Sequence, residues 1–155
     1  MSSFEAYSSD TNIKDLIKSL FDAELPLDGD WGYSKELATI IQANYNNIPI
    51  KQLEHMVASM RTYLEMNITQ VEEDRYGNIN VNETSRKQKK ENDLAYDIVT
   101  YEITAMKESI YASFISEYKE GYQKKYFNLD NHFKKRKEAT LTRKVIYYFN
   151  VSSIK

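Results

Sequence analysis

Hydrophobic side chains in the first 64 residues recur at spacings of three and four, which is the period of an amphipathic helix. The pattern predicts three helices, whose apolar faces run from Ile13 to Phe21, from Leu37 to Tyr45 and from Ile50 to Leu64. Asp10 or Thr11 is placed to cap the first helix, and proline, glycine and asparagine separate the three. The third face forms a continuous seam, so we expect it to pack along another helix.

The pattern changes near residues 68–82, where β-branched residues flank Tyr76-Gly77-Asn78. A short β-hairpin would place this glycine in its turn. The alternation is brief and acidic residues interrupt it, so a polar loop fits nearly as well. Both interpretations stay open from the sequence alone.

The segment from about 84 to 126 contains no proline and one glycine, Gly121. Its apolar residues trace two adjacent stripes at helical spacing, which predicts one long helix with an apolar face wider than a surface helix needs. We expect this helix to be central to the fold. A last helix is expected from His132 to about Phe149, although residues 145–151 are aromatic and β-branched enough to be a strand.

Together these elements predict a mainly α, single-domain bundle of about five helices. Residues 1–9 are expected to form a flexible N-terminal tail, and residues 10–155 a single helical domain. A chain of 155 residues with 41% hydrophobic and 28% charged residues can bury a core of this kind without disulfides or structural metal ions.

Composition excludes several classes of chemistry. The chain has no cysteine, which rules out disulfides, thiolate metal sites and a cysteine nucleophile. Its polar start does not read as a signal peptide, and no apolar run approaches the roughly 20 residues that span a bilayer. These features predict a soluble, cytoplasmic protein without membrane contact.

No catalytic, cofactor or metal motif stands out. The two histidines, His55 and His132, have no metal-binding partner spacing, and phosphate-binding glycine loops are absent. Turn chemistry explains the aspartates near Gly29 without a metal ion. We therefore expect no cofactor and no metal, and an enzyme of unrecognised type ranks third among the possible functions.

Charge is distributed unevenly along the chain. Residues 1–82 carry six Lys/Arg and 13 Asp/Glu, whereas residues 83–155 carry 15 Lys/Arg and 10 Asp/Glu. The chain also has 13 tyrosines, a residue type enriched at interfaces. These features favour a non-catalytic interaction or regulatory protein, such as an adaptor, an antitoxin or an immunity-type binder. Its partner would be another protein or a second copy of itself.

The loop between the first two predicted helices contains the single tryptophan, Trp31. A loop tryptophan either plugs the end of a core or anchors a partner. Because acidic residues flank it, we predict a partner-binding loop formed by Asp28, Asp30, Trp31 and Tyr33.

A basic, aromatic segment at residues 119–144 supports an alternative function. Lysines neutralise phosphates and aromatic rings stack on unpaired bases, so this composition suits RNA or single-stranded DNA. A second basic cluster lies at residues 86–90. The predicted nucleic-acid-binding residues are Lys124, Lys125, Lys134, Lys135, Arg136, Lys137, Arg143 and Lys144.

Overall fold

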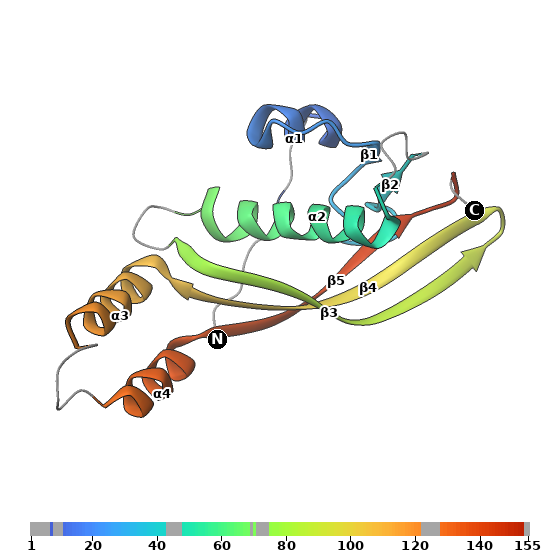
Figure 1. The fold of residues 1–155 in the computed structure, drawn as a ribbon. Coiled ribbons are helices and arrows are strands. Elements are labelled where there is room, and N and C mark those ends of the chain that lie inside the picture. The colour runs from blue at the N-terminus through green and yellow to red at the C-terminus, as the bar shows by residue number, and fades with distance from the viewer. Residues whose placement is uncertain are drawn as a thin grey trace.

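The computed structural model describes residues 7, 11–42, 48–68, 70, 75–121 and 128–153. In these residues, helices are interspersed with strands along the chain, and five strands form one mixed sheet in the order β1-β2-β5-β4-β3 (Figure 1). The elements are α1 (Ile13–Phe21), β1 (Leu27–Gly29), β2 (Thr39–Ile41), α2 (Ile50–Tyr63), the π-helix η1 (Leu64–Ile68), β3 (Tyr76–Glu91), β4 (Leu94–Lys107), α3 (Glu108–Gly121), α4 (Leu129–Ala139) and β5 (Leu141–Asn150). The protein therefore has an α/β fold, and the prediction of a mainly α helical bundle was wrong.

The largest error concerns the long central helix predicted over 84–126. This stretch contains the second half of β3, all of β4 and the helix α3, and the two strands form an antiparallel hairpin. Its turn includes Asn92, whose φ of 55° is the left-handed conformation that asparagine tolerates. Buried side chains in β4 recur mainly at every second residue, which is the strand period. Apolar residues on both faces of this strand produced the two stripes that resembled a wide helical face.

The short hairpin near 68–82, one of the two interpretations that the sequence left open, is also wrong. Tyr76-Gly77-Asn78 lies inside β3, and the pairing of β3 with β4 shifts between Gly77 and Asn80. This irregularity accommodates the glycine and Asn78, whose φ is 51°, without turning the chain back. Residues 69 and 71–74 lie outside the described part of the chain.

Two further segments were predicted as helices and contain strands instead. The second predicted helix, 37–45, contains β2, while 43–47 lie outside the described residues. The last predicted helix is α4 followed by β5, so the strand alternative at 145–151 was the better one. β5 lies inside the sheet, parallel to β2 and antiparallel to β4, and its β-branched and aromatic residues suit that buried position.

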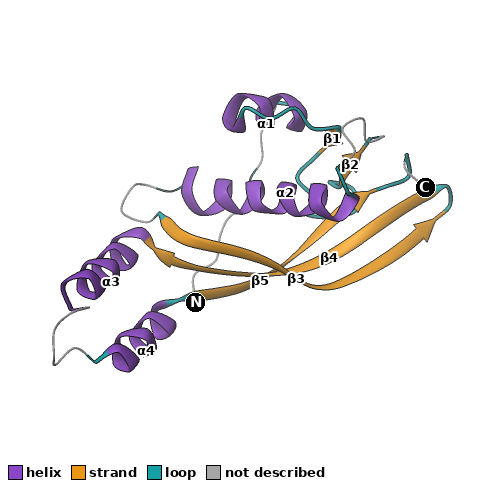
Figure 2. Cartoon of the chain, viewed as in Figure 1, coloured by secondary structure: helices purple, strands orange, loops and turns teal. Residues whose placement is uncertain are grey.

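The first and third predicted helices are confirmed as α1 and α2. The cap of α1 is Asn12, next to the predicted Thr11, and its side chain accepts a hydrogen bond from the Lys14 N–H at 2.8 Å. In Figure 2, α2 crosses one face of the sheet and α1 lies beyond α2. The seam of α2 therefore packs on strands and not on a long helix.

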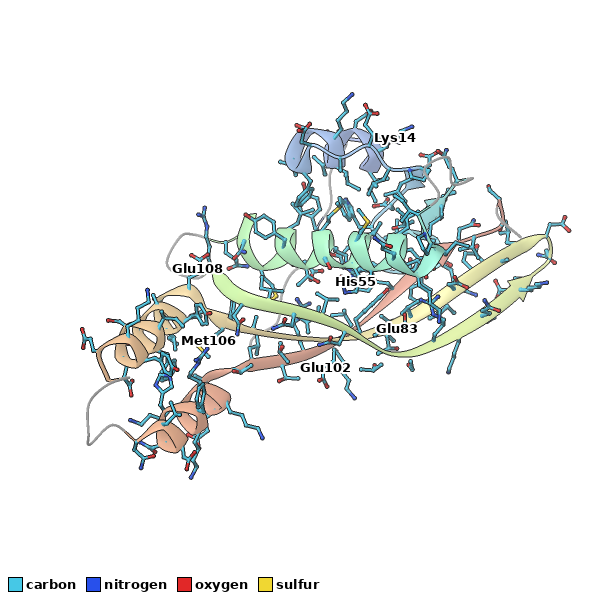
Figure 3. The ribbon with its side chains drawn as sticks, viewed as in Figure 1. Lys14, His55, Glu83, Glu102, Met106 and Glu108 are labelled. Atoms are coloured by element: carbon cyan, nitrogen blue, oxygen red, sulfur yellow. The ribbon has the colours of Figure 1, made fainter. Side chains whose placement is uncertain are left out.

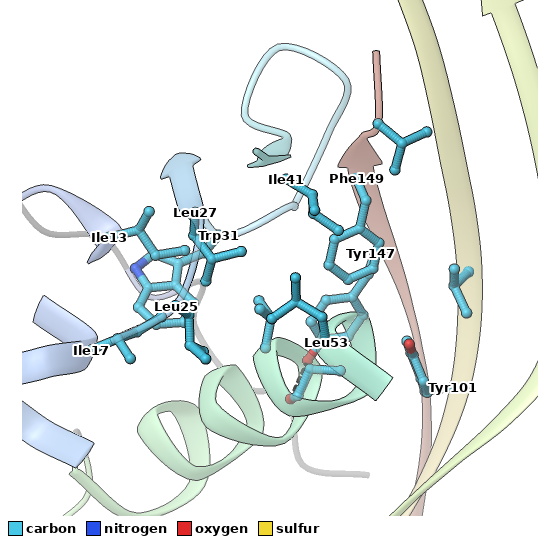
Figure 4. Packing of buried hydrophobic residues seen from close by; sticks show 14 of the residues in the cluster. Ile13, Ile17, Leu25, Leu27, Trp31, Ile41, Leu53, Tyr101, Tyr147 and Phe149 are labelled. Atoms are coloured by element: carbon cyan, nitrogen blue, oxygen red, sulfur yellow. Dashed lines mark hydrogen bonds between the residues drawn. The ribbon is translucent and has the colours of Figure 1, made fainter. Parts of the chain in front are cut away.

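The core forms where α1, α2 and the sheet meet. Trp31 packs at one end of this core, and Leu53 of α2 packs toward β2 and β5 at the other (Figure 4). Trp31 is 2% exposed, and the ring of Tyr7 contacts it edge-on at 5.7 Å. The buried side chains around these two ends include Ile13, Ile17, Leu25, Leu27, Ile41, Tyr147 and Phe149.

A buried arginine connects α2 to the sheet and to the loop after β1. The guanidinium of Arg61 lies 3.9 Å from the ring centre of Tyr33 and 3.4 Å from that of Tyr147. It donates a hydrogen bond to the Trp31 carbonyl at 3.1 Å, and its Nε lies 3.5 Å from a carboxylate oxygen of Glu65. A buried charge needs such partners, because loss of one partner leaves an uncompensated charge in the core.

The β1–β2 hairpin provides a test of the fold. Gly29 has a φ of 80°, and a β-carbon there would lie 2.6 Å from the Ala38 carbonyl oxygen. We expect Gly29→Ala to lower the free energy of unfolding by about 1–3 kcal/mol, because strain and a backbone clash combine. Urea denaturation would measure this loss. The control is Gly77→Ala, where the nearest atom is a side-chain carbon of Glu108 at 3.4 Å, so little loss of stability is expected. Equal losses in both variants would contradict the strained conformation and close contact described for Gly29.

Candidate functional site

A helical hairpin projects from one end of the sheet. The chain passes from β4 directly into α3 at Glu108 and returns from α4 into β5 at Leu141. Because Ala105 of β4 pairs with Leu141 of β5, the hairpin leaves and re-enters the sheet on neighbouring strands. Figure 2 shows α3 and α4 at the end of the sheet, away from α1. The hairpin therefore contributes little to the main core.

The two helices hold each other through aromatic side chains. His132 of α4 is buried, with the Phe114 and Tyr118 rings centred 5.8 and 5.7 Å away and a Glu117 carboxylate oxygen 3.5 Å from its Nδ1. Across the described residues of the hairpin, His132 and Gly121 are the buried ones. Three of its large apolar side chains are exposed: Ile110, Leu129 and Phe133.

One surface of α4 combines apolar and cationic side chains. Leu129 is 44% exposed and Phe133 is 47% exposed, one helical turn apart. Lys134 and Lys137 lie beside them and are also exposed. We call Leu129, Phe133, Lys134 and Lys137 the α4 surface. Large exposed apolar side chains rimmed by charges are typical of interaction sites.

The structure separates the eight cations that the sequence suggested for nucleic-acid binding. Arg143 forms an ion pair with buried Glu65 at 2.9 Å, so its charge is already compensated. Lys144 is the next residue of the strand and lies on the opposite face of the sheet. Lys124 and Lys125 lie outside the described residues. The remaining four are together on α4: Lys134, Lys135, Arg136 and Lys137.

The second basic cluster lies on β3, at the edge of the sheet. Lys87, Lys89 and Lys90 are exposed there, and lysines on an edge strand discourage pairing with another chain. Arg86 points inward and contacts carboxyl groups. These residues therefore do not join the cations of α4.

The loop with the single tryptophan is fixed to the core. Trp31 is buried, and Asp28 and Asp30 accept hydrogen bonds from the next backbone N–H at 2.8 and 3.1 Å. The Tyr33 hydroxyl donates to Glu65 and accepts from the Tyr7 N–H. Among the four predicted partner-binding residues, the indole is therefore committed to packing, and partner binding by the loop stays a prediction.

Arg86 faces three carboxyl groups where α2, β3 and β4 meet. It lies 2.8 Å from Glu54, 3.3 Å from Asp97 and 2.7 Å from Glu83. Glu54 and Asp97 are buried, whereas Glu83 is partly exposed. One cation cannot neutralise three carboxylates, so the buried pair retains a proton.

The pKa values follow from this arrangement. Burial is the main cause that raises the pKa of Glu54 to about 8, and a hydrogen bond with Asp97 adds to it, while Arg86 opposes both. A hydrogen bond between two carboxyl groups needs a proton on one of them, which Glu54 supplies. Glu83, held by Arg86, has its pKa lowered. Burial and nearby Glu54 raise the pKa of the Tyr101 hydroxyl.

Sequence reasoning missed this cluster. It placed Arg86 and Asp97 in the long helix predicted over 84–126. Had β4 been recognised, its period of two would have placed Asp97 on the buried face with Val99 and Tyr101. The cluster can hold a proton, and it fixes α2 on the β3–β4 hairpin.

His55 lies outside this cluster, on the side of α2 near β3 (Figure 3). Its Nε2 is 2.8 Å from the Val81 carbonyl oxygen, and it lines a groove of about 460 Å³. The described residues that line the groove include neither Glu54 nor Asp97. The histidine and the buried carboxyl pair therefore do not share one cavity. The other lining residues are Ser59, Tyr63, Ile79, Asn80 and Asn82.

Comparisons with known proteins add no functional information. No family model, curated protein or solved structure matches this chain. Within the described ranges, no three His, Asp or Glu side chains are placed to hold a metal ion. No helix in the same ranges has both the length and the apolar character needed to cross a membrane.

The buried carboxyl pair predicts how stability depends on pH. Because folding raises the pKa of Glu54 from 4.5 to about 8, the native state binds one more proton than the unfolded state between these values. The free energy of unfolding should therefore fall as pH rises from 4.5 to 8, by up to about 1.4 kcal/mol per unit. Denaturation curves across this range would measure the slope.

Glu54→Gln imitates the protonated carboxyl and should flatten that slope. The control is Glu83→Gln, which removes a carboxylate of lowered pKa and should reduce stability while preserving the fall between pH 4.5 and 8. An undiminished fall in Glu54→Gln would show that another group holds the proton.

Proposed function

We propose that this chain is a non-catalytic interaction protein, of the adaptor, antitoxin or immunity type, that binds an acidic partner protein through the α4 surface. The observation that carries the proposal is the exposure of Leu129 and Phe133 on a projecting hairpin. Burying a side chain of this size contributes roughly 1.5–3 kcal/mol. The two side chains lie one turn apart on a hairpin that adds little to the core, and a partner would bury them together.

The charges beside the apolar pair support an acidic partner. Lys134 and Lys137 border the apolar pair, and Lys135 lies on the same helix. Complementary charge would speed association and select against basic proteins. The partner should therefore present an apolar patch bordered by aspartate or glutamate.

A protein fits this surface better than a nucleic acid. Arg143 is already paired with Glu65, and Lys144 lies on another face, so the cationic surface is short. Asp130 and Glu138 lie on α4 itself and would repel phosphates. The apolar side chain of Leu129 would gain no favourable contact from a phosphate backbone, whereas an apolar patch on a protein would bury it.

Site-specific crosslinking tests the proposal. A photoreactive amino acid replaces Phe133 in the full chain in its native cell, and the same residue replaces Leu20 of α1 as the control, since Leu20 is 44% exposed. We expect position 133, and not position 20, to give one protein adduct that survives nuclease treatment. Equal labelling from both positions would refute a dedicated surface.

The purified partner then allows affinity to be measured. Phe133→Ala should weaken binding at least about tenfold, as expected for a central apolar contact, while Leu20→Ala should leave it unchanged. Lys134→Glu combined with Lys137→Glu should slow association. An adduct with RNA, and affinity that falls steeply with salt, would instead favour the nucleic-acid alternative and overturn the protein proposal.

A further inference from the structure

Helix α3 has an apolar side that α4 does not cover. Phe114 and Tyr118 face α4, whereas Ala112 and Ile115 lie about a quarter turn around the helix. This second side lines an open groove of about 470 Å³. The lining residues are Tyr111, Ala112, Ile115, Ser116, Lys119 and Glu120.

Two opposite charges, Glu108 and Lys119, lie near the two ends of this side, and Glu120 lies next to Lys119. Glu108 lies where α3 leaves the sheet (Figure 3), and Lys119 lies near the other end. Eleven residues separate them, or about 16 Å along the helix, so they cannot pair within one chain. In the part of the chain that the structure describes, neither side chain forms an ion pair.

The sequence of this side is self-complementary when read in the opposite direction. If two copies of α3 pack antiparallel and are centred between residues 113 and 114, Glu108 of each copy faces Lys119 of the other. Ala112 then faces Ile115, a small residue opposite a large one. A two-fold symmetric interface requires such a pattern, because the same surface meets itself.

We propose that the chain forms a symmetric homodimer through this side of α3, with the two hairpins combined into an antiparallel four-helix bundle. Small side chains at Ala112 and Ser116 let the two helix axes approach, and Ile115 fills the space between them. Two Glu108–Lys119 pairs fix the direction of packing. The inference does not rest on the α4 surface, which lies on another side of the hairpin.

Sedimentation equilibrium of the full chain tests the dimer. We expect the wild-type chain to sediment as a dimer. Ala112→Glu should raise the dissociation constant at least about tenfold, because it buries two like charges near the two-fold axis. Ser113→Glu is the control, since Ser113 is exposed and one residue further around the helix, and it should change the constant little. Circular dichroism verifies that both variants are folded.

Charge reversal tests the direction of packing. Glu108→Lys alone or Lys119→Glu alone should weaken the dimer, whereas both changes together should restore it, because each reversed charge meets its reversed partner in the other copy. A parallel pair would place Glu108 against Glu108, so the double variant would gain nothing.

A wild-type chain that stays monomeric at all concentrations would overturn the dimer. A double variant as weak as the single ones would overturn its antiparallel packing through Glu108 and Lys119. Neither result bears on the α4 surface. Crosslinking from position 133 reports the other partner separately, so the two proposals fail independently.

Discussion

The position of α2 on the sheet depends on the buried guanidinium of Arg61. It is stacked between Tyr33 of the loop and Tyr147 of β5, and it also contacts Glu65. These contacts join segments from the first half of the chain to the last strand. A buried charge of this kind tolerates few alternative arrangements, because every displacement leaves an unpaired group in the core. The second cluster, around Arg86, sets the register between α2 and β3 in the same way.

The sequence predicted elements whose signal is local. The apolar period and caps of α1 and the seam of α2 depend on neighbours within a few residues, and both helices were found. The prediction failed at β4, where apolar residues on both faces imitate the spacing of a wide helix. Burial decides between the two, and burial depends on partners far along the chain, such as Tyr101 of β4 paired with Val145 of β5.

The residues of the candidate site also divide into those that local sequence located and those that it missed. The run from Lys134 to Lys137 is contiguous, so the sequence located the cations of α4. Arg143 belongs to the basic, aromatic segment 119–144, but its partner Glu65 is 78 residues away. Arg86 and Glu54 are 32 residues apart, and no pattern within either segment indicates their contact. Charged side chains that form ion pairs within the fold cannot be distinguished from unpaired ones until the pairing of the strands is known.

The junction at Ala105 and Leu141 gives the helical hairpin a modular character. Because these residues are paired neighbours on adjacent strands, a tight turn between them would close the sheet as well as the hairpin does. The hairpin can therefore change in length or composition while the sheet keeps its register. The same junction should accept other helical hairpins by design, much as one antibody framework accepts different loops.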